Sequence, residues 1–323
     1  MQQLEFIHKT NEYASLNIPF LFLVDFEMKN PFVCKLSQAQ ENGFRYFVNG
    51  DTNSKSELIP KISRFNMNIS PVSKQGYSNA FNLVKQNILA GNTYLLNLTF
   101  PSEIQTKLSL EDIFYSAEAP YKLLHDNFVV FSPECFIKII YGDIYSYPMK
   151  GTIDAAIPNA KEMILRDKKE LWEHNTIVDL IRNDLSMVSE NVRVERFRYI
   201  TKIKTHKNKL LQVSSEIKGK LPNNWKNNLG NVLLKLLPAG SVSGAPKQKT
   251  LEIIKKAEGE KRGYYTGIFG IFDGINLDSA VMIRYIEKTT IGFQFRSGGG
   301  ITAMSKENEE YNELLDKVYV PII

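Results

Sequence analysis

The chain has 323 residues, 43% of them hydrophobic, so it can bury a large core and could hold one big domain or two ordinary ones. The net charge of +5 is mild, and the one dense basic run, 201–209, is interpreted as a solvated loop or edge and not as a nucleic-acid site. Two distant cysteines, Cys34 and Cys135, exclude a disulfide framework and a zinc site. The densest apolar run, 18–24, is far too short to span a bilayer, and the N-terminus does not resemble a leader peptide. We therefore expect a cytoplasmic protein that binds neither nucleic acid nor membrane.

The N-terminal part of the chain favours strands. The runs 19–27 and 44–50 are aromatic and β-branched and are closed by turn residues, which is typical of strands. The polar stretch 51–74 contains two prolines and predicts a linker between this β piece and the rest. Apolar residues at helical spacing over 77–88 then predict a helix that stops at Gly91, and a strand follows.

The middle of the chain predicts an antiparallel meander followed by a helix. The strands would be 127–134, 135–140 and 144–152, and the last of them ends in the sequence PMKGT with Lys150 near its end. A helix is predicted from Asp167, which would act as N-cap and form a capping box with Glu170.

The C-terminal third mixes glycine loops, strands and helices. The segment 239–247 predicts a glycine-rich loop that leads into a helix, and 277–288 predicts a strand. The run 296–302, RSGGGIT, predicts a second glycine loop before a last helix that starts near Ser305. Strands come in runs and do not alternate strictly with helices, so we expect an α+β fold with large antiparallel sheets.

Two predicted helices each carry a pair of carboxylates three residues apart, Glu170 with Glu173 and Glu310 with Glu313. Such pairs share one helix face, and two of these faces together could hold a hard cation such as Mg²⁺. Solvated acidic pairs are the simpler alternative from spacing alone.

The glycine loops could let the backbone approach an anionic ligand, although 239–247 is not a Walker A loop because Gln248 stands where Ser or Thr should be. Arg284, in the middle of a strand pattern, needs a buried anionic partner or an open face. Glu134 and Lys150 share the predicted meander; an acid and an amine in one cleft suit covalent catalysis, but a structural ion pair would have the same sequence.

Together, the motifs SPE, PMKGT, ELWEHNTIVDLIRND, GSVSGAPK, YYTG, MIRY, SGGGI and EEYNELLDK occur in the order and spacing of the chorismate-utilising enzymes. The chain resembles this family, which includes anthranilate, isochorismate, salicylate and aminodeoxychorismate synthases, from about Ser73 to its end, and more loosely over 1–72. The resemblance implies a single domain over 1–323, with two large, mostly antiparallel β-sheets packed together and helices outside. It also implies a Mg²⁺-dependent chorismate site.

The family's motifs imply roles for individual residues. Glu173 and Glu313 resemble the metal ligands, with Glu170 and Glu310 as their close supporters, and Glu134 resembles the acid that protonates the leaving C4 hydroxyl. The residues that resemble substrate contacts are Thr152, Ser243, Gly244, Tyr265, Arg284, Gly298, Gly299, Gly300 and Lys317.

Lys150 distinguishes the branches of the family. Anthranilate synthases have a small residue there, whereas aminodeoxychorismate synthases have a lysine whose neutral amine attacks C2 of chorismate. Ammonia then enters at C4, supplied by a separate glutamine amidotransferase, in the branch that leads to 4-aminobenzoate and folate. The isochorismate and salicylate synthases activate water with a lysine where this chain has Leu95, which cannot take a proton. Gln212 stands where many members have histidine.

The resemblance therefore implies the chorismate-aminating large subunit of an aminodeoxychorismate synthase. An anthranilate-synthase-like enzyme and a catalytically inactive chorismate-binding regulatory subunit are the alternatives.

Overall fold

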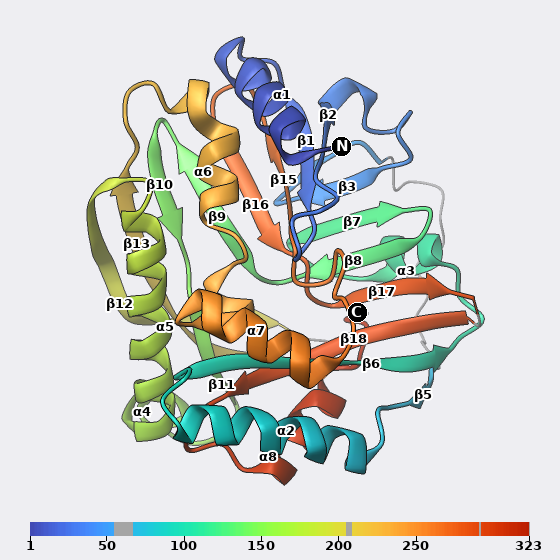
Figure 1. The fold of residues 1–323 in the computed structure, drawn as a ribbon, viewed down its shortest axis with the longest axis vertical. Coiled ribbons are helices and arrows are strands. Elements are labelled where there is room, and N and C mark those ends of the chain that lie inside the picture. Colours follow the sequence, from blue (N-terminus) through green and yellow to red (C-terminus); the bar gives the residue numbers. More distant parts are fainter. Residues whose placement is uncertain (55–66, 205–208, 291, 323) are drawn as a thin grey trace.

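The fold consists of two nine-stranded β-sheets with helices around them, as the computed structural model shows for residues 1–54, 67–204, 209–290 and 292–322 (Figure 1). Every strand pairing in the described residues is antiparallel. The predicted α+β class is confirmed. No helix in the described part of the chain is long and apolar enough to cross a membrane.

The first sheet takes strands from both halves of the chain, and β12 (Glu190–Lys204) adds to it by pairing with β13. In sheet order, its other strands are β11 (Met149–Asp154), β13 (Lys209–Lys220), β10 (Asp143–Ser146), β9 (Cys135–Ile140), β16 (Leu277–Val281), β15 (Ile268–Phe272), β1 (Phe20–Val24) and β2 (Phe32–Lys35).

The second sheet is equally mixed, and β5 (Asn68–Ser70) adds to it by pairing with β6. In sheet order, its other strands are β14 (Gly244–Ala245), β6 (Leu95–Gln105), β18 (Gly292–Ile301), β17 (Tyr285–Thr289), β8 (Phe128–Ser132), β7 (Tyr121–His125), β3 (Arg45–Val48) and β4 (Asp51–Thr52).

Helices cover the outside of the two sheets (Figure 1). The α-helices are α1 (Gln3–Ser15), α2 (Lys74–Leu89), α3 (Leu110–Ser116), α4 (Ala160–Arg166), α5 (Lys168–Ser186), α6 (Leu229–Lys235), α7 (Lys247–Glu258) and α8 (Glu307–Asp316). Three short 3₁₀ helices are η1 (Leu36–Gln38), η2 (Trp225–Asn228) and η3 (Gly240–Val242).

The N-terminal segment is built into both sheets. β1 is buried along its whole length between β2 and β15 of the first sheet, while β3 pairs with β7 of the second. The continuous apolar run of this segment therefore correctly predicts a strand, and such a run is typical of a strand that is buried on both faces. The predicted linker over 51–74 lies partly outside the described residues, and its described ends form β4, β5 and the start of α2.

The predicted meander around Lys150 is wrong in its pairing. β9 and β10 form the expected hairpin, but β8 belongs to the second sheet, and β11 pairs with β13 instead of β10. Sequence proximity favours neighbouring strands in only about two-thirds of cases, and here a long-range strand, β13, lies between the two.

Two further strand predictions are corrected. The run 277–288 is two strands in different sheets, β16 and β17, and Arg284 lies at the break between them with φ +53°. The glycine run 296–302 is not a flexible loop, because Gly298, Gly299 and Gly300 lie inside β18. A Cβ on Gly298 would lie 2.3 Å from the carbonyl oxygen of Leu98, so the close pairing of β18 with β6 explains a glycine there.

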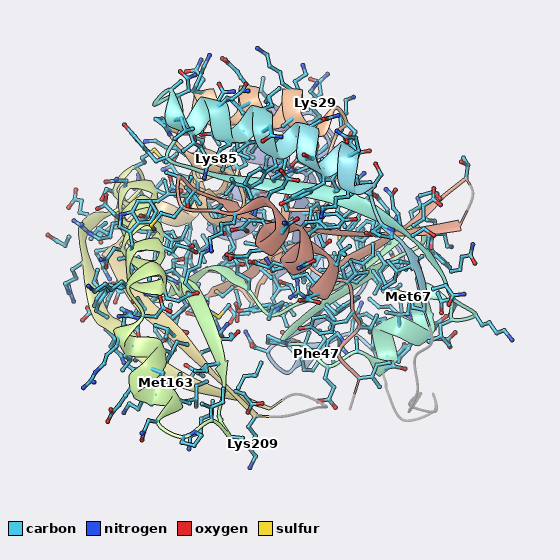
Figure 2. All side chains as sticks on the ribbon, turned by 90° about the horizontal axis from the view of Figure 1, so that it is seen from below. Lys29, Phe47, Met67, Lys85, Met163 and Lys209 are labelled. Atoms are coloured by element: carbon cyan, nitrogen blue, oxygen red, sulfur yellow. The ribbon has the colours of Figure 1, made fainter. Side chains whose placement is uncertain are left out.

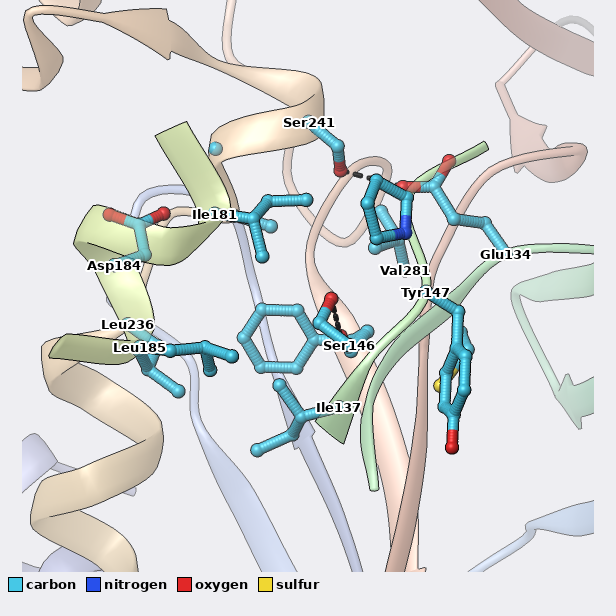
Figure 3. A pocket seen from close by; sticks show the side chains of 15 residues that line it. Glu134, Ile137, Ser146, Tyr147, Ile181, Asp184, Leu185, Leu236, Ser241 and Val281 are labelled. Atoms are coloured by element: carbon cyan, nitrogen blue, oxygen red, sulfur yellow. Dashed lines mark hydrogen bonds between the residues drawn. The ribbon is translucent and has the colours of Figure 1, made fainter. Parts of the chain in front are cut away.

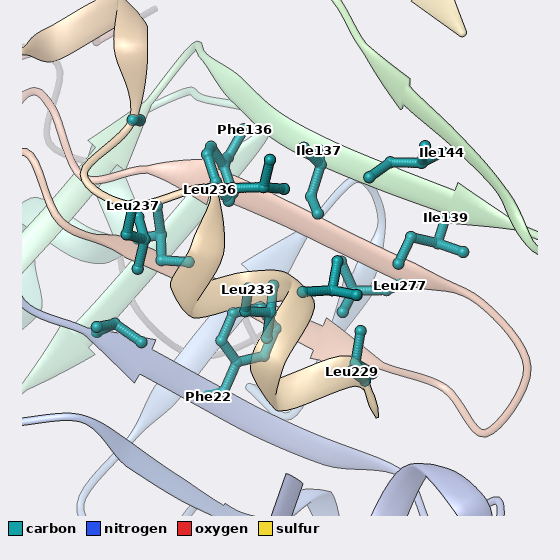
Figure 4. Close-up of a cluster of buried hydrophobic side chains, with 14 of the residues drawn as sticks. Phe22, Phe136, Ile137, Ile139, Ile144, Leu229, Leu233, Leu236, Leu237 and Leu277 are labelled. Carbon is teal, nitrogen blue, oxygen red and sulfur yellow. The ribbon is translucent and has the colours of Figure 1, made fainter. Parts of the chain in front are cut away.

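The largest part of the core lies where α6 packs on the first sheet (Figure 4). Leu229 and Leu233 of α6 contact a cluster that includes Phe22, Ile139 and Leu277 from three strands, and all five side chains are almost fully buried. These apolar contacts fix the first sheet beneath the segment from α6 to α7, which leads to the predicted ligand-binding glycines.

A buried ion pair joins α7 to the second sheet. The side chains of Arg262 and Glu258 are only 1% and 2% exposed, and two hydrogen bonds of 2.8 and 2.5 Å join them. Arg262 also donates to the carbonyl oxygens of Val242 and Asn97, and Glu258 accepts from Thr99. The pair therefore satisfies backbone groups of β6 and η3 as well as its own charges.

We predict that Arg262→Met lowers the free energy of unfolding by about 3–5 kcal/mol, because it leaves Glu258 charged and buried without its partner. Urea denaturation measures the effect. The control is Lys306→Met, which breaks the exposed pair of Lys306 and Glu309, whose side chains are 75% and 54% exposed, and should leave the stability almost unchanged. Equal losses in the two variants would contradict the assignment.

Candidate active site

Lys150 and Glu173 meet between β11 and α5. The Nζ atom of Lys150 lies 3.6 Å from Oε2 of Glu173, and both side chains are largely buried, with 29% and 14% exposed. Lys150 lies within β11, and its ion-pair partner is Glu173 and not Glu134, the partner considered in the structural alternative.

A buried histidine fixes α5 against the first sheet. His174 is fully buried and its Nε2 lies 2.7 Å from the hydroxyl of Ser215 on β13, whose backbone N–H donates to the carbonyl of Pro148. Burial lowers the pKa of His174 to about 4, so the ring is neutral near pH 7. The sequence analysis did not single out His174; its place beside Glu173 in a predicted helix was the available signal.

The glycines of β18 form a shallow surface beneath charged side chains of α8. A Cβ on Gly299 would lie 3.4 Å from Oε1 of Glu313, 3.5 Å from Oε2 of Glu310 and 3.7 Å from Nζ of Lys317. A Cβ on Gly300 would lie 3.6 Å from Nζ of Lys150. Consecutive residues of a strand point to opposite faces, so Gly299 faces the charged side chains of α8 and Gly300 faces Lys150.

Lys317, at the C-terminal end of α8, neutralises part of this carboxylate group. Its Nζ lies 2.6 Å from Oε1 of Glu313 and donates to the carbonyl oxygen of Gly298 at 2.7 Å. Burial lowers the pKa of Lys317, although Glu313 opposes this.

The start of α8 is held in place by α2. Nζ of Lys85, on α2, donates to three carbonyl oxygens of the segment 302–305, which leads into α8. Figure 2 shows this side of the molecule, with α2 above α8 and Lys85 labelled on α2. A partly buried lysine on one helix therefore orients the helix that carries Glu310 and Glu313.

Glu170 lies at the start of α5, one turn before Glu173. Asp167 caps this helix as predicted, and its side chain accepts a 2.9 Å hydrogen bond from the N–H of Glu170. The Glu170 side chain extends to β11, where a Cβ on Gly151 would lie 2.8 Å from its Oε2. Gly151, which has φ +77°, therefore allows the close approach of α5 to the strand that carries Lys150.

Glu134 lies between β8 and β9, where the chain passes from the second sheet to the first. Its Oε1 accepts a 2.6 Å hydrogen bond from the hydroxyl of Ser241. Burial raises the pKa of the Glu134 carboxyl, while Ser241 and the positive charges of Lys150, Lys317 and Arg284 oppose the rise. The structure thus places Glu134 within electrostatic reach of Lys150 and favours its protonated form.

The other residues predicted to contact the substrate differ in their exposure and in their partners. The guanidinium of Arg284 stacks over the ring of Tyr319 at 5.0 Å. Tyr265 is buried, and burial raises its pKa to about 12. The hydroxyl of Ser243 is fully buried and donates to the carbonyl of Ala239, and Thr152 is exposed on β11.

Two further residues, Gly244 and Leu95, pack closely against neighbouring strands. Gly244 has φ +131°, and a Cβ there would lie 1.9 Å from the carbonyl oxygen of Leu95, so no other residue fits this pairing of β14 with β6. Leu95 is 7% exposed, and its Cδ1 would lie 3.1 Å from a Cβ on Gly300. Gln212 pairs with Thr152 across β11 and β13.

The described residues contain no group of three or more histidine, cysteine or acidic side chains that could hold a metal ion. Glu310 and Glu313 lie together beside Gly299, whereas Glu170 lies beside Gly151 and Glu173 beside Lys150 on the α5 side. The structure thus combines carboxylates, cations and backbone without side chains, an arrangement suited to a small anionic ligand.

Comparison with known proteins identifies the class to which this fold and site belong. The sequence pattern of the chorismate binding enzymes matches residues 14–322, so the chain belongs to the chorismate binding enzyme family. This match extends the predicted resemblance, expected from about Ser73, through most of the N-terminal segment.

Three individual relatives show which named proteins the chain is similar to. A Haemophilus influenzae protein named "Uncharacterized PabA-like protein" is 52% identical over 318 residues, covering 98% of this chain and 96% of that protein. Anthranilate synthase component 1 1 of Haloarcula marismortui is 30% identical over 77% of this chain and 53% of its own length. Aminodeoxychorismate synthase component 1 of Bacillus subtilis is 28% identical over 77% of this chain and 55% of its own length.

The fold also matches that of a solved structure. Anthranilate synthase component I from Streptococcus pneumoniae superimposes with a TM-score of 0.73 at 20% identity, covering 97% of this chain and 82% of that chain. The predicted arrangement of two large antiparallel sheets is therefore confirmed as the fold of chorismate-utilising enzymes.

We predict that Glu134→Gln becomes more stable relative to the wild type as the pH rises from 4 to 8. A raised pKa means that the folded protein binds the Glu134 proton more tightly than the unfolded chain, whose glutamate pKa is about 4.3. The stabilisation is complete below that pH and is lost as the pH rises through the folded-state pKa. Urea denaturation at several pH values measures this difference.

The control for that measurement is Glu252→Gln, at an exposed glutamate of α7 that is paired with Lys249. A difference between wild type and Glu134→Gln that stays constant with pH would contradict a buried, protonated Glu134.

Proposed function

We propose that the protein is the chorismate-aminating large subunit of an aminodeoxychorismate synthase. It would convert chorismate and ammonia to 4-amino-4-deoxychorismate, on the route to 4-aminobenzoate and folate. The family limits the substrate to chorismate, and the observation that carries the rest is the half-buried Lys150, beside Glu173 and within the electrostatic reach of Glu134. A lysine in this position supplies a nucleophile that a small residue could not.

In this mechanism Lys150 and Glu134 act in sequence. The neutral amine of Lys150 attacks C2 of the ring, the double bond shifts, and the C4 hydroxyl leaves as water with the proton of Glu134. Ammonia then adds at C4, the double bond shifts back, and the bond between C2 and Lys150 breaks. The raised pKa of Glu134 supports the first step, because a proton donor must hold its proton until the hydroxyl leaves.

The cationic side chains would hold the substrate's two carboxylates. Arg284 and Lys317 both influence Glu134 electrostatically, and Lys317 extends over Gly298 and Gly299. Gly244 and Gly298 pack against the backbone of β6, whereas Gly299 lies beside Lys317 and Gly300 beside Lys150, so the last two are the glycines closest to the cationic side chains. Ser243, Tyr265 and Thr152 remain predicted contacts.

Magnesium is the proposed cofactor, with Glu173 and Glu313 as ligands and Glu170 and Glu310 as supporters. The residues fit this ion because all four offer hard carboxylate oxygens, and those of Glu310 and Glu313 converge on the space that a Cβ on Gly299 would fill. When bound, the ion would neutralise a substrate carboxylate next to the glutamates.

The alternatives make different products. An anthranilate-synthase-like enzyme would aminate C2, a reaction that Lys150 disfavours because its side chain occupies the position from which ammonia would attack. Water activation as in isochorismate synthases is disfavoured by Leu95, which is apolar and buried beside Gly300. An inactive chorismate-binding regulatory subunit would have no reason to keep Glu134, Lys150 and the carboxylate pairs together.

Ammonia would come from a separate glutamine amidotransferase subunit. The similarity to aminodeoxychorismate synthase component 1 of Bacillus subtilis supports this pathway. The cytoplasmic location expected from the sequence stays a prediction. Incubation with chorismate, Mg²⁺ and ammonium salt separates the three readings by product: 4-amino-4-deoxychorismate, anthranilate or unchanged chorismate.

We predict that Lys150→Ala folds and binds chorismate but loses C4 amination on the order of a hundredfold or more, a loss typical of a missing chemical group. Lys150→Arg should not restore activity, because a guanidinium stays protonated. Product analysis measures the loss, and intact-protein mass spectrometry of the wild type without ammonia should find a ring-derived adduct on the peptide containing Lys150. Full amination by Lys150→Ala would disprove the covalent mechanism.

We predict that Glu173→Gln raises the Mg²⁺ concentration needed for half-maximal activity at least about tenfold, because a neutral amide is a weaker ligand for a hard cation. A magnesium titration of the steady-state rate measures the change, and Glu162→Gln, at an exposed glutamate of α4, is the control. An unchanged magnesium requirement in Glu173→Gln would count against the proposed metal site.

A further inference from the structure

A small cavity lies behind Glu134, on the first-sheet side of the proposed active site (Figure 3). Its volume is about 30 Å³. The polar groups at its edges come from Glu134, Ser146, Tyr147, Asp184 and Ser241. The apolar part of the wall is formed by Phe136, Ile137, Ile181, Leu185, Leu236 and Val281. In Figure 3, Glu134 and Asp184 lie on opposite sides of this space.

The cavity's two carboxylates are held by one short segment, η3. Glu134 accepts a hydrogen bond from the hydroxyl of Ser241, and Asp184 accepts one from the backbone N–H of Gly240. A Cβ on Gly240 would lie 2.8 Å from Oδ2 of Asp184, so a glycine is needed for this close approach. Both carboxylates are therefore fixed, and they face a common space.

Asp184 also connects the cavity with a lysine nearer to solvent. Oδ1 of Asp184 lies 3.2 Å from Nζ of Lys247, and their side chains are 14% and 24% exposed. Lys247 further donates to the carbonyl of Leu236, which fixes it at the start of α7. Burial raises the pKa of Asp184, and Lys247 opposes this. The Asp184 end of the cavity is thus polar, ordered and close to the surface.

The size of the cavity limits what it can hold. A volume of about 30 Å³ accepts one molecule the size of water and excludes a six-membered ring. Ammonia and ammonium have nearly the size of water, and both donate hydrogen bonds to carboxylates and hydroxyls. The fixed acceptors at the two ends match a small N–H donor.

We propose that this cavity is the binding site of the ammonia molecule that the amination consumes, with the Asp184 carboxylate accepting an N–H bond from it. The inference rests on the proposed function, because that reaction needs ammonia at C4, the carbon at which Glu134 acts. Glu134, the residue proposed to act at C4, is itself part of the cavity lining.

The proton balance of the reaction closes within this arrangement. Glu134 gives its proton to the C4 hydroxyl, which leaves as water, and is then a carboxylate beside the bound ammonia. The nitrogen lone pair forms the bond to C4, the double bond shifts back, and the electron pair of the bond between C2 and Lys150 returns to the lysine nitrogen. The new ammonium group at C4 then gives one proton to Glu134, which regenerates the acid and leaves Lys150 neutral.

The test is the KM for ammonium salt in the intact protein, with chorismate and Mg²⁺ saturating. Asp184→Asn keeps the shape but weakens the acceptor, and Val281→Ile adds one methylene group to the cavity wall. Both should raise this KM about tenfold, while the KM for chorismate and the yield of the Lys150 adduct without ammonia stay within about twofold of the wild type. The matched control is Asp143→Asn, which breaks the ion pairs of a carboxylate with Lys218 and Lys220 elsewhere in the first sheet and should leave both KM values unchanged.

Two further measurements, the pH dependence of the ammonium KM and competition by rubidium chloride, distinguish bound NH₃ from bound NH₄⁺. If NH₃ binds, the KM expressed as total ammonium falls about tenfold per pH unit between pH 6 and 8, and rubidium chloride does not compete. If NH₄⁺ binds, it gives one proton to the Asp184 carboxylate before its nitrogen attacks C4; that KM then changes little over this range, and rubidium chloride competes with ammonium. Either pattern supports the site when Asp184→Asn weakens it.

The outcomes also separate this site from the proposed function. C4 amination with an unchanged ammonium KM in both Asp184→Asn and Val281→Ile would overturn the cavity and leave the function standing, since the space would then hold water only. Formation of anthranilate with a raised ammonium KM would overturn the C4 chemistry and keep the ammonia site. A rise of both KM values by the same factor would assign Asp184 a structural role and overturn the proposal.

Discussion

The buried pair of Arg262 and Glu258 is the interaction on which one wall of the site depends. It joins the end of α7 to β6 and to η3, through hydrogen bonds to the backbone of Asn97 and Val242. The segment from Gly240 to Pro246, which contains Ser241, Ser243 and Gly244, is therefore held between two fixed points. A buried charge is stable only beside its partner. The ion pair is therefore costly to bury, but it also holds this segment in one position.

The other wall depends on two places where the chain changes sheets. Between β8 and β9 it passes Glu134, and between β16 and β17 it passes Arg284. The two crossings run beside each other, because Val281 donates its N–H to the carbonyl of Glu134 and Phe131 donates to the carbonyl of Arg284. Glu134 and Arg284 are far apart in sequence, but the two crossings bring them together at the junction of the sheets. Neither residue lies within a β-strand.

Much of the fold and part of the site can be predicted from the sequence. The amphipathic helix over 77–88, the cap at Asp167 and the fold class follow from local rules, which the structure confirms. The glycine run in β18 was misread because glycine signals a turn locally, whereas here it is required by the neighbouring strand and by α8. The split between β16 and β17 was missed although Arg284 interrupts the apolar pattern of 277–288, because one charged residue does not by itself indicate a change of sheet.

The role of His174 shows the limit of sequence reasoning at the site. Its hydrogen bond to Ser215 spans 41 residues and joins α5 to the strand that pairs with β11. No local pattern specifies such a contact, although it sets the distance between Lys150 and Glu173. The residues proposed to carry the chemistry are found by motif, while those that position them follow only from the packing.

The charges around the glycines of β18 explain why a site of this kind would need a cation. Glu173 pairs with Lys150 and Glu313 with Lys317, Glu310 lies beside Gly299 and Glu170 beside Gly151, and burial raises the pKa of Glu134. A substrate with two carboxylates would add negative charge to a group that already has a small excess of it, in surroundings where unscreened repulsion is strong. A bound divalent ion would reverse that excess before the substrate arrives, so binding of the proposed magnesium and of chorismate should be coupled. The raised pKa of Glu134 has a second consequence. A protonated Glu134 would not repel the negatively charged substrate, whose ring this carboxyl group must approach.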